Sequence, residues 1–423
     1  MSLLFLSVGC TKDNTTTTAD PIVSTMNPLK GPKTTVVTFT GTDFGEDPNL
    51  VQVFFDEIES EIQLITDTEI VVIVPPRSFL GNVRLVIKGV EITGFKFDYE
   101  IVDIQVTTFA GNGVNGSTDA NGINASFSSP SHISLDASGN FYVTDALSSI
   151  RKINPNGDVT IFAGSSVELD FANGTGINAR FNFALGSAVD SSGNIYVADF
   201  SNHRIRKITP SGVVSTFAGS VQGFVDDIGN NAQFDGPTDI VVDASDNLYV
   251  VDFGNQRIRK ITADGIVTTV AGSIKGYLDG TSNTAQFNNP TGISIDASGN
   301  LYIADSGNFR IRKIDTDAIV STVAGSALPL NGEEVDESLF IIPRDVTLDR
   351  LGNIYITDLG NHSIRKITQD GIITTIAGSE QGFNDSNGAT AQFSNPYGIL
   401  IDDTFTIYVA DFDNDRIRKI MQE

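Results

Sequence analysis

Residues 299–305 read Gly-Asn-Leu-Tyr-Ile-Ala-Asp, and close copies of this pattern stand at residues 193–199 and 352–358. The aspartate that ends the pattern occurs six times, at intervals of 53 or 54 residues. Its positions are Asp145, Asp199, Asp252, Asp305, Asp358 and Asp411. Self-similarity at one fixed period is the mark of a repeat architecture. The chain from Val106 onward is therefore predicted to be a series of tandem copies of one β unit.

Each copy contains four short runs with the composition of β-strands, which we name strands a to d in chain order. In the fourth copy we expect these strands at residues 292–296, 301–305, 310–314 and 319–324. Four short strands repeated radially form the blades of a β-propeller. A linear solenoid would need capping repeats at its ends, and the sequence shows none. The six copies therefore predict a six-bladed propeller.

The two ends of the repeat region predict how the ring closes. Its first element, residues 106–111, has the pattern of a lone strand d, whereas the chain ends on strands a, b and c, the last at residues 417–420. We expect the lone strand to complete the last blade. This arrangement closes the ring and leaves no free interior strand edge.

Residues 21–101 form a separate unit ahead of the repeats. Runs rich in β-branched and aromatic residues, separated by turn signals, stand at residues 35–40, 51–55, 70–74, 83–87 and 95–99. Short strands at this spacing predict a small immunoglobulin-like sandwich. The whole chain is thus expected to be all-β, with a leader and tether at 1–20, the sandwich at 21–101 and the propeller at 102–423.

Both units resemble known families. The pattern Pro290-Thr291-Gly292-Ile293, followed by Asp296, Tyr302, Asp305 and Arg310-Ile311-Arg312-Lys313-Ile314, resembles the NHL repeat in all six copies. The sandwich resembles the IPT/TIG domain through residues 28–32, 37–45, 53–55, 70–75 and 97–99. The second resemblance implies a spacer or an accessory interaction module.

The N-terminus contains the only cysteine, Cys10, after a short apolar run and before a polar tract with four threonines. This order resembles the end of a bacterial lipoprotein signal, which implies an acylated Cys10 and a lipid-anchored protein of the bacterial cell envelope, at the outer membrane or cell surface. The apolar run is short and no basic residue precedes it, unlike a complete signal. The alternative is an ordinary N-terminus with an incidental cysteine. No run has membrane-spanning length, so we expect contact with the membrane through the lipid only.

Composition and residue spacing exclude several classes of function. A net charge of −25 is opposite to the basic surface that nucleic acid requires, so nucleic acid is not an expected partner. The chain has three histidines; His203 and His362 fall in b–c loops of opposite blades and cannot converge with His132. The motifs of serine hydrolases and the ligand spacings of zinc sites are absent from the sequence.

Residues that occur in every blade are predicted to serve the scaffold. The closing aspartates and the Arg-Lys pair of strand c are expected to form a structural network, because a sixfold ring of catalytic sites is improbable. A sixfold set of phenylalanines is expected to plug the spaces between blades. These are Phe127, Phe181, Phe234, Phe287, Phe340 and Phe393.

Function is expected where the copies differ, at the first two residues after the proline position of strand a, which lines the central channel. Glycine is the commonest residue at the second position, but three copies carry another residue there. The exceptional side chains at the two positions are His132, Asp239, Arg344, Asp345 and Tyr397. Convergent polar groups in a concave mouth favour ligand binding. The alternative is that they satisfy one another and ordered water.

The long d–a loops on the same face offer a second set of candidates. Three loops place an aromatic residue near an aspartate, with Phe224, Tyr277 and Phe383 as the aromatic residues. They could contact a ligand, but a self-packed loop is the simpler expectation. The fifth loop is acidic at residues 332–337; it could hold calcium, although its spacing is not an EF-hand pattern. No other cofactor is expected.

Together these features favour an envelope scaffold whose propeller face binds a protein or a glycan. The alternative is an extracytoplasmic metal-dependent hydrolase or lyase with its site at the channel mouth, and a purely architectural protein is a third possibility. The enzyme hypothesis is the weaker one because no catalytic arrangement is visible. The sequence leaves the oligomeric state open.

Overall fold

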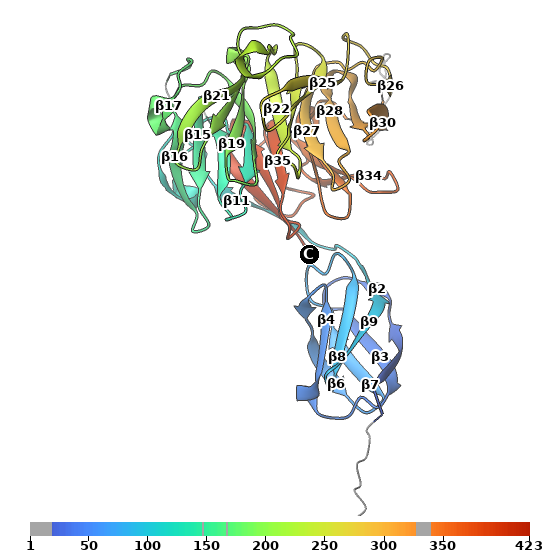
Figure 1. The fold of residues 1–423 in the computed structure, drawn as a ribbon. Helices are drawn as coiled ribbons and strands as arrows, with labels where there is room; N and C mark the ends of the chain where they lie inside the picture. The colour runs from blue at the N-terminus through green and yellow to red at the C-terminus, as the bar shows by residue number, and fades with distance from the viewer. Residues whose placement is uncertain (1–18, 146–147, 166–167, 327–339) are drawn as a thin grey trace, which may run out of the picture. The chain divides into compact units, whose positions relative to one another are not determined.

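A computed structural model describes residues 19–145, 148–165, 168–326 and 340–423. The chain divides into two compact units between Val102 and Asp103 (Figure 1). Within the described ranges every helix is a single three-residue 3-10 turn, so the protein is all-β as predicted. No helix in this part of the chain is long and apolar enough to cross a membrane.

The first unit is a sandwich of two four-stranded sheets with strand orders β1-β3-β7-β6 and β5-β4-β8-β9, accompanied by the short parallel pair β10-β2. The strands of the first sheet are β1 (Ile22–Asn27), β3 (Val36–Thr42), β7 (Glu69–Ile73) and β6 (Glu61–Ile65). Those of the second are β5 (Ile58–Glu59), β4 (Val51–Phe55), β8 (Asn82–Ile87) and β9 (Val90–Lys96), and the pair is β10 (Asp98–Tyr99) with β2 (Lys30–Gly31).

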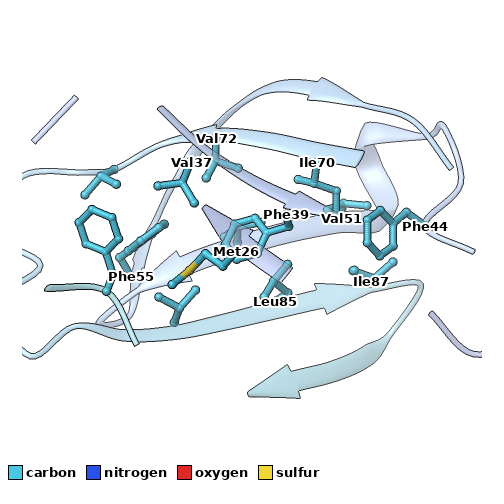
Figure 2. Packing of buried hydrophobic residues seen from close by; sticks show 14 residues of the cluster. Met26, Val37, Phe39, Phe44, Val51, Phe55, Ile70, Val72, Leu85 and Ile87 are labelled. Carbon is cyan, nitrogen blue, oxygen red and sulfur yellow. The ribbon is translucent and has the colours of Figure 1, made fainter. Parts of the chain in front are cut away.

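Alternate residues of these strands point between the two sheets and form one core (Figure 2). Phe39, Phe55 and Leu85 are completely buried there. Phe55 meets Phe97 edge to face, with ring centroids 5.4 Å apart. The side chains of this cluster are all apolar.

The sequence located β4 correctly but missed β1 and β6 and the two-residue strands β2 and β5, and it merged parts of β9 and β10 into one strand. Of the missed strands, β1 and β6 are the outer strands of the first sheet. Their side chains are mostly exposed, so the alternation of apolar and polar residues that identifies a half-buried strand is weak in them.

The second unit is a ring of six blades, each an antiparallel sheet in the order a-b-c-d. Blade 1 contains β13 (His132–Leu135), β14 (Phe141–Asp145), β15 (Ser149–Ile153) and β16 (Asp158–Gly164). Blade 2 contains β18 (Ala184–Val189), β19 (Ile195–Asp199), β20 (Arg204–Ile208) and β21 (Val213–Gly219). Blade 3 contains β22 (Pro237–Val242), β23 (Leu248–Asp252), β24 (Arg257–Ile261) and β25 (Val267–Ala271).

Blade 4 contains β27 (Pro290–Ile295), β28 (Leu301–Asp305), β29 (Arg310–Ile314) and β30 (Ile319–Gly325). Blade 5 contains β31 (Pro343–Leu348), β32 (Ile354–Asp358), β33 (Ser363–Ile367) and β34 (Ile373–Ala377). Blade 6 contains β35 (Pro396–Ile401), β36 (Ile407–Asp411) and β37 (Arg416–Gln422). Short extra strands extend three of the sheets: β12 (Ala120–Asn121), β17 (Gly174–Thr175) and β26 (Gly280–Thr281).

The ring closes as predicted. β11 (Ile104–Ala110) pairs antiparallel with β37, placing Ile104 opposite Gln422, and so supplies the outer strand of blade 6 (Figure 1). The first strands of neighbouring blades contact one another around the axis, and β35 contacts β13 to complete the circle. The strand-a residues therefore line one central channel.

The predicted scaffold network is confirmed. In blade 4, Asp305 and Arg312 are fully buried, with Oδ2 and the guanidinium 2.7 Å apart. The other carboxylate oxygen accepts the backbone N–H of Asn288 at 2.8 Å. The same ion pair occurs in every blade, at 2.7 to 3.6 Å. The six repeated phenylalanines are completely buried between blades.

Candidate functional site

Six residues at one equivalent position of strand a surround the channel axis. In blade order they are His132, Gly186, Asp239, Gly292, Asp345 and Gly398. Side chains thus alternate with glycines around the ring, and the three side chains come from blades 1, 3 and 5. We call His132, Asp239 and Asp345 the axial trio.

The alternating positions are glycine because a side chain there would have no space. A Cβ on Gly292 would lie 2.6 Å from the Cα of Asp345, and one on Gly186 would lie 2.2 Å from Oδ1 of Asp239. Neither glycine has the left-handed backbone that only glycine adopts easily. A closely packed interior tolerates no such overlap. Every second blade must therefore lack a side chain so that the other three can converge.

His132 contacts both carboxylates of the trio. Its Nε2 lies 3.3 Å from Oδ1 of Asp239 and 3.7 Å from Oδ2 of Asp345. On the opposite side of the imidazole, the backbone N–H of Ser187 donates to Nδ1 at 3.2 Å. A neutral imidazole that accepts at Nδ1 carries its proton on Nε2. The imidazole thus donates toward the two carboxylates.

The two aspartates are held by the backbone of their own and other blades. Asp239 accepts the N–H groups of Ile240 at 2.8 Å and Ile293 at 2.9 Å. Asp345 does the same with Val346 at 2.8 Å and Ile399 at 2.9 Å. These bonds cross from blade 3 to blade 4 and from blade 5 to blade 6. Both carboxylates are therefore fixed in place as well as buried.

Burial raises the pKa of Asp239 to about 7. Burial also raises the pKa of Asp345 to about 7, and there the negative charge of Asp239 adds to the effect. Among the described residues, no Lys or Arg nitrogen lies within ion-pairing distance of either carboxylate, and His132 is their one ion-pair partner. The trio is thus a buried site with an excess of negative charge when both aspartates ionise.

An aromatic stack stands at the mouth of the channel beside the trio. The guanidinium of Arg344 lies over the Tyr397 ring, 4.6 Å from its centroid. Tyr397 in turn stacks on Phe412, with ring centroids 4.3 Å apart and planes at 20°. Within the described ranges the Arg344 guanidinium has no hydrogen-bond or ion-pair partner. Its five N–H donors are available to a ligand.

The threonine hydroxyl groups at the mouth are, by contrast, used within the protein. Thr238 donates to the carbonyl of Thr291 at 2.9 Å, and Thr291 donates to the carbonyl of Arg344 at 2.6 Å. These bonds join strand a of one blade to strand a of the next. Arg344 is therefore the group with unused donors at this rim.

The axial trio separates two spaces of different size. On the mouth side, a cavity of about 10 Å³ is lined by the trio, its three glycines, Arg344 and Tyr397. This volume holds about one water molecule. On the other side, a cavity of about 210 Å³ is lined mainly by Ile, Val and Leu side chains of strand a, and His132 and Asp345 reach it too.

All five side chains predicted for the mouth lie around this one small cavity. Their binding of a ligand stays a prediction. The sequence did not anticipate Phe412, which extends the stack from the b–c loop of blade 6. A phenylalanine follows the closing aspartate in blades 2, 3 and 6, as Phe200, Phe253 and Phe412, but only Phe412 has an aromatic residue at the place of Tyr397. The alternation of glycines with His132, Asp239 and Asp345 was visible along the chain, but its meaning depends on the ring.

The aromatic residues of the d–a loops pack against their own scaffold. Phe224 lies under the guanidinium of Arg257 at 4.1 Å, Tyr277 under Arg310 at 3.9 Å and Phe383 under Arg416 at 3.8 Å. Their exposed fractions are 44%, 46% and 42%, so one face of each ring remains accessible. A ligand contact for these rings also stays a prediction.

The aspartate beside each of these rings has a structural role. Asp279, for example, binds the Arg312 guanidinium at 2.6 Å and accepts the N–H of Thr322 at 3.2 Å. Strand c offers each of these aspartates an arginine partner. Cys10 and the acidic loop at 332–337 lie outside the described residues.

The other two histidines are distant from the trio in role and place. His203 accepts the N–H of Gly236 at 3.0 Å, and His362 accepts that of Asn395 at 3.2 Å. Each ends the b–c turn of its blade in a left-handed conformation. Of the described residues, His132, Asp239 and Asp345 alone form a group able to share a metal ion, with their ligand atoms within 4.8 Å of one another.

Comparisons with known proteins agree with this architecture. The IPT/TIG domain profile matches residues 21–102, and the NHL repeat profile matches residues 181–208, 234–261, 287–314 and 340–367. The chain is 31% identical over 282 residues to Protein SUPPRESSOR OF QUENCHING 1, chloroplastic, of Arabidopsis thaliana, covering 61% of this chain and 26% of that protein. It is 30% identical over 215 residues to NHL repeat-containing protein 2 of Bos taurus, covering 44% of this chain and 30% of that protein. The chain thus spans less than a third of either relative.

Solved structures resemble the chain over nearly its whole length. A structural genomics protein of unknown function from Bacteroides thetaiotaomicron has a TM-score of 0.66 at 21% identity, covering 96% of this chain and 98% of that one. An auxiliary nutrient binding protein from Bacteroides ovatus has a TM-score of 0.58 at 19% identity, with the same coverage. At these identities the likeness concerns the fold. The chain thus contains a region that matches the IPT/TIG domain, followed by a propeller in which four stretches match the NHL repeat.

Proposed function

We propose that the protein is a binding component of the bacterial cell envelope, anchored through Cys10, whose propeller mouth binds a protein or a glycan. The observation that carries the proposal is the stack of Arg344 on Tyr397 and Phe412. Its guanidinium has unused donors beside a concave mouth. An arginine held on an aromatic face is preorganised, so it loses little side-chain entropy when it binds an acceptor.

The size of the mouth restricts how a ligand can bind. The cavity above the axial trio has a volume of about 10 Å³, too small for a sugar ring or an amino-acid side chain. A ligand must therefore rest on the rim and contact Arg344 and Tyr397 from outside. A protein loop or the end of a glycan chain fits this requirement better than a small molecule enclosed in a pocket.

The name of one similar protein fits a binding role. The Bacteroides ovatus protein is described as an auxiliary nutrient binding protein, and its likeness to this chain extends over both units. This supports a binding function for the fold in general terms. The ligand of the present protein is a matter for experiment.

A binding screen tests the proposal. The full chain is assayed against arrays of glycans and of extracellular proteins, and any hit is measured again with Arg344→Ala and Tyr397→Ala. Each substitution is expected to weaken binding at least about tenfold, as loss of a buried-interface anchor does. The control is Arg350→Ala. Arg350 belongs to the same blade as Arg344 but lies in the a–b turn, where its guanidinium is 5.4 Å from the centroid of the Phe405 ring. Equal binding by all three variants would refute the mouth as the site.

The proposed anchor has its own test. Cells producing the protein with its native leader are labelled with a fatty-acid analogue, and the membrane fraction is compared with that of Cys10→Ser. We expect label and membrane association in the wild type and neither in the variant. If both the wild type and the variant carry the label, the lipid is attached to another residue. If neither protein carries it, the lipid anchor is removed from the proposal.

The metal-dependent hydrolase or lyase remains the second candidate, because the axial trio has the composition of a metal site. The argument against this enzyme function is lack of space, because the small cavity leaves no room for a substrate at the trio on the mouth side. Turnover of ester, lactone or uronide substrates by the metal-loaded protein, lost in His132→Gln, would favour it over the binding function.

A further inference from the structure

We propose that the axial trio, His132, Asp239 and Asp345, binds one divalent transition-metal ion on the propeller axis. This goes beyond the proposed function, which concerns Arg344 and Tyr397 at the rim, and it holds whether or not the rim binds a macromolecule. Four features of the trio support it: the spacing of its ligand atoms, its unbalanced charge, the space beside it and the surroundings of His132.

The spacing of the ligand atoms fits a small metal ion. Bonds of about 2.1 Å in tetrahedral coordination place ligand atoms about 3.4 Å apart. Nε2 of His132 lies 3.3 Å from the carboxylate oxygen of Asp239 and 3.7 Å from that of Asp345. All three atoms lie within 4.8 Å of one another. Small side-chain adjustments therefore suffice to bring the three atoms around one ion.

The charge of the trio is unbalanced without a cation. The six strand-b aspartates, all fully buried, each face an arginine of their own blade, as Asp305 faces Arg312 at 2.7 Å. Asp239 and Asp345 face each other and one imidazole instead, and the charge of Arg344 acts on Asp239 only from beyond ion-pairing distance. Buried charges without a partner are costly in free energy. A divalent ion supplies the compensation that the rest of the ring obtains from arginine.

The trio also has room for an ion and an exchangeable ligand. Three protein ligands leave the fourth position of a tetrahedral ion open. The adjoining cavity of about 10 Å³ lies on the mouth side, and one water fills such a volume.

Metal binding at Nε2 changes the hydrogen bonding of His132, and a neighbouring hydroxyl can replace the bond that is lost. Nδ1 accepts the Ser187 N–H, so Nε2 holds the proton that faces the carboxylates, and moving that proton to Nδ1 breaks the bond from the Ser187 N–H. A metal on Nε2 displaces that proton, and a metal-bound histidine donates from its other nitrogen. The Ser187 hydroxyl, 3.4 Å from Nδ1 and 3.0 Å from the Ser134 hydroxyl, is the acceptor at hand.

The ligand set selects the class of metal. Calcium prefers six to eight oxygen ligands, whereas the trio offers one nitrogen and two carboxylates. One imidazole with carboxylates suits zinc or manganese, and zinc binds more tightly by the general order of affinities. We therefore expect zinc to bind more tightly than manganese, and calcium more weakly than both.

Calorimetry with the metal alone tests the site. The full chain with Cys10→Ser, which removes the thiol as a ligand, is freed of metal with a chelator and titrated with zinc, manganese and calcium. We expect one equivalent of zinc. In the same background, His132→Gln and Asp345→Asn should each weaken binding at least about 100-fold. His203→Gln is the matched control and should bind zinc as the parent does. Thermal melts establish that each variant is folded.

Proton NMR identifies the site in the parent protein, with variants used only to assign signals. The chain has three histidines, so the imidazole C–H signals can be assigned with His203→Gln and His362→Gln. Substoichiometric manganese should broaden the His132 signals and leave the other two sharp. The proposal is overturned if the parent binds no zinc, or if His132→Gln retains full affinity. It is also overturned if manganese broadens another histidine first.

Discussion

Asp305 in strand b and Asp345 at the axis are both buried aspartates of the same ring, with exposed fractions of 0% and 5%. Asp305 pairs with Arg312 of its own blade at 2.7 Å. Asp345 has His132 at 3.7 Å and the negative Asp239 nearby, both from other blades. The repeated charge is balanced locally in each copy. The unrepeated charges can be balanced only by groups that meet at the axis, or by a ligand.

The largest effect is expected from breaking the repeated pair. Arg312→Ala leaves Asp305 buried without its cation, which costs about 3–5 kcal/mol in the free energy of unfolding. Denaturant unfolding followed by circular dichroism measures it. Lys313→Ala is the control in the same strand, because this side chain is only partly buried and lies over the Tyr302 ring at 5.7 Å. A loss for Arg312→Ala no greater than that of the control would show that the network does not stabilise the ring.

A smaller loss of stability is expected when an added methyl group obstructs the packing of the axial trio. Gly292→Ala places a Cβ 2.6 Å from the Cα of Asp345, and overpacking of this kind costs about 1–3 kcal/mol. The comparison is Gly371→Ala, where the added Cβ meets no atom within 4 Å but φ is +83°. That variant should lose about 1 kcal/mol from backbone strain alone. Thermal melts of both variants separate lack of space from lack of conformational freedom.

The loop aromatics should contribute less. Phe224→Ala removes the ring beneath Arg257, whose guanidinium lies 4.1 Å from the ring centroid. Because the ring is 44% exposed, we expect a loss of about 0.5–1 kcal/mol. The melting temperature reports this loss. A fall as large as that of Arg312→Ala would assign these repeated loops to the structural core of the network.

The smallest effect is a pH dependence at a b–c turn. Burial lowers the pKa of His203, although Asp235 acts in the opposite sense, so folding favours the neutral ring that accepts the Gly236 N–H. Its contribution is complete above its ordinary pKa of about 6.5 and is lost as the pH falls through the lower folded value. His203→Gln should therefore lose less stability than the wild type between pH 8 and pH 5.

The chain itself offers the model for that substitution. Gln256 stands at the equivalent place in blade 3 and accepts the Asn289 N–H with its side-chain oxygen at 2.6 Å. Glutamine has no proton to gain in this range. Stability curves against pH that run parallel for the wild type and His203→Gln would contradict the role assigned to His203.

Much of the propeller could be predicted because the same pattern of strands and turns occurs in every repeat. The expected strands at 301–305 and 310–314 match β28 and β29 as observed. The edge strands β1 and β6 were missed in the sandwich, where each strand occurs once and a weak pattern has no second copy to confirm it. Repetition thus compensates for the weakness of any single signal.

The candidate site was predicted only as a set of exceptions to the repeat. His132, Asp239 and Asp345 were named because glycine was expected at their position, and Arg344 and Tyr397 because small residues were expected at theirs. Phe412, the contact between Nε2 of His132 and both carboxylates, and the single-water cavity were not predicted. The contact and the cavity depend on distances between blades that are more than 50 residues apart in the chain, whereas Phe412 meets Tyr397 within blade 6.

The sequence by itself determined the number of blades, the order of their strands, the way the ring closes and the structural role of the charges that recur in every blade. Local pattern and fixed spacing are sufficient for these features, because each is a property of one repeat or of the order of strands along the chain. Only the tertiary structure decided that His132, Asp239 and Asp345 share one point while three glycines make room for them. Ring closure brings blades 1, 3 and 5 to a common axis, and that convergence exists in no shorter piece of the chain.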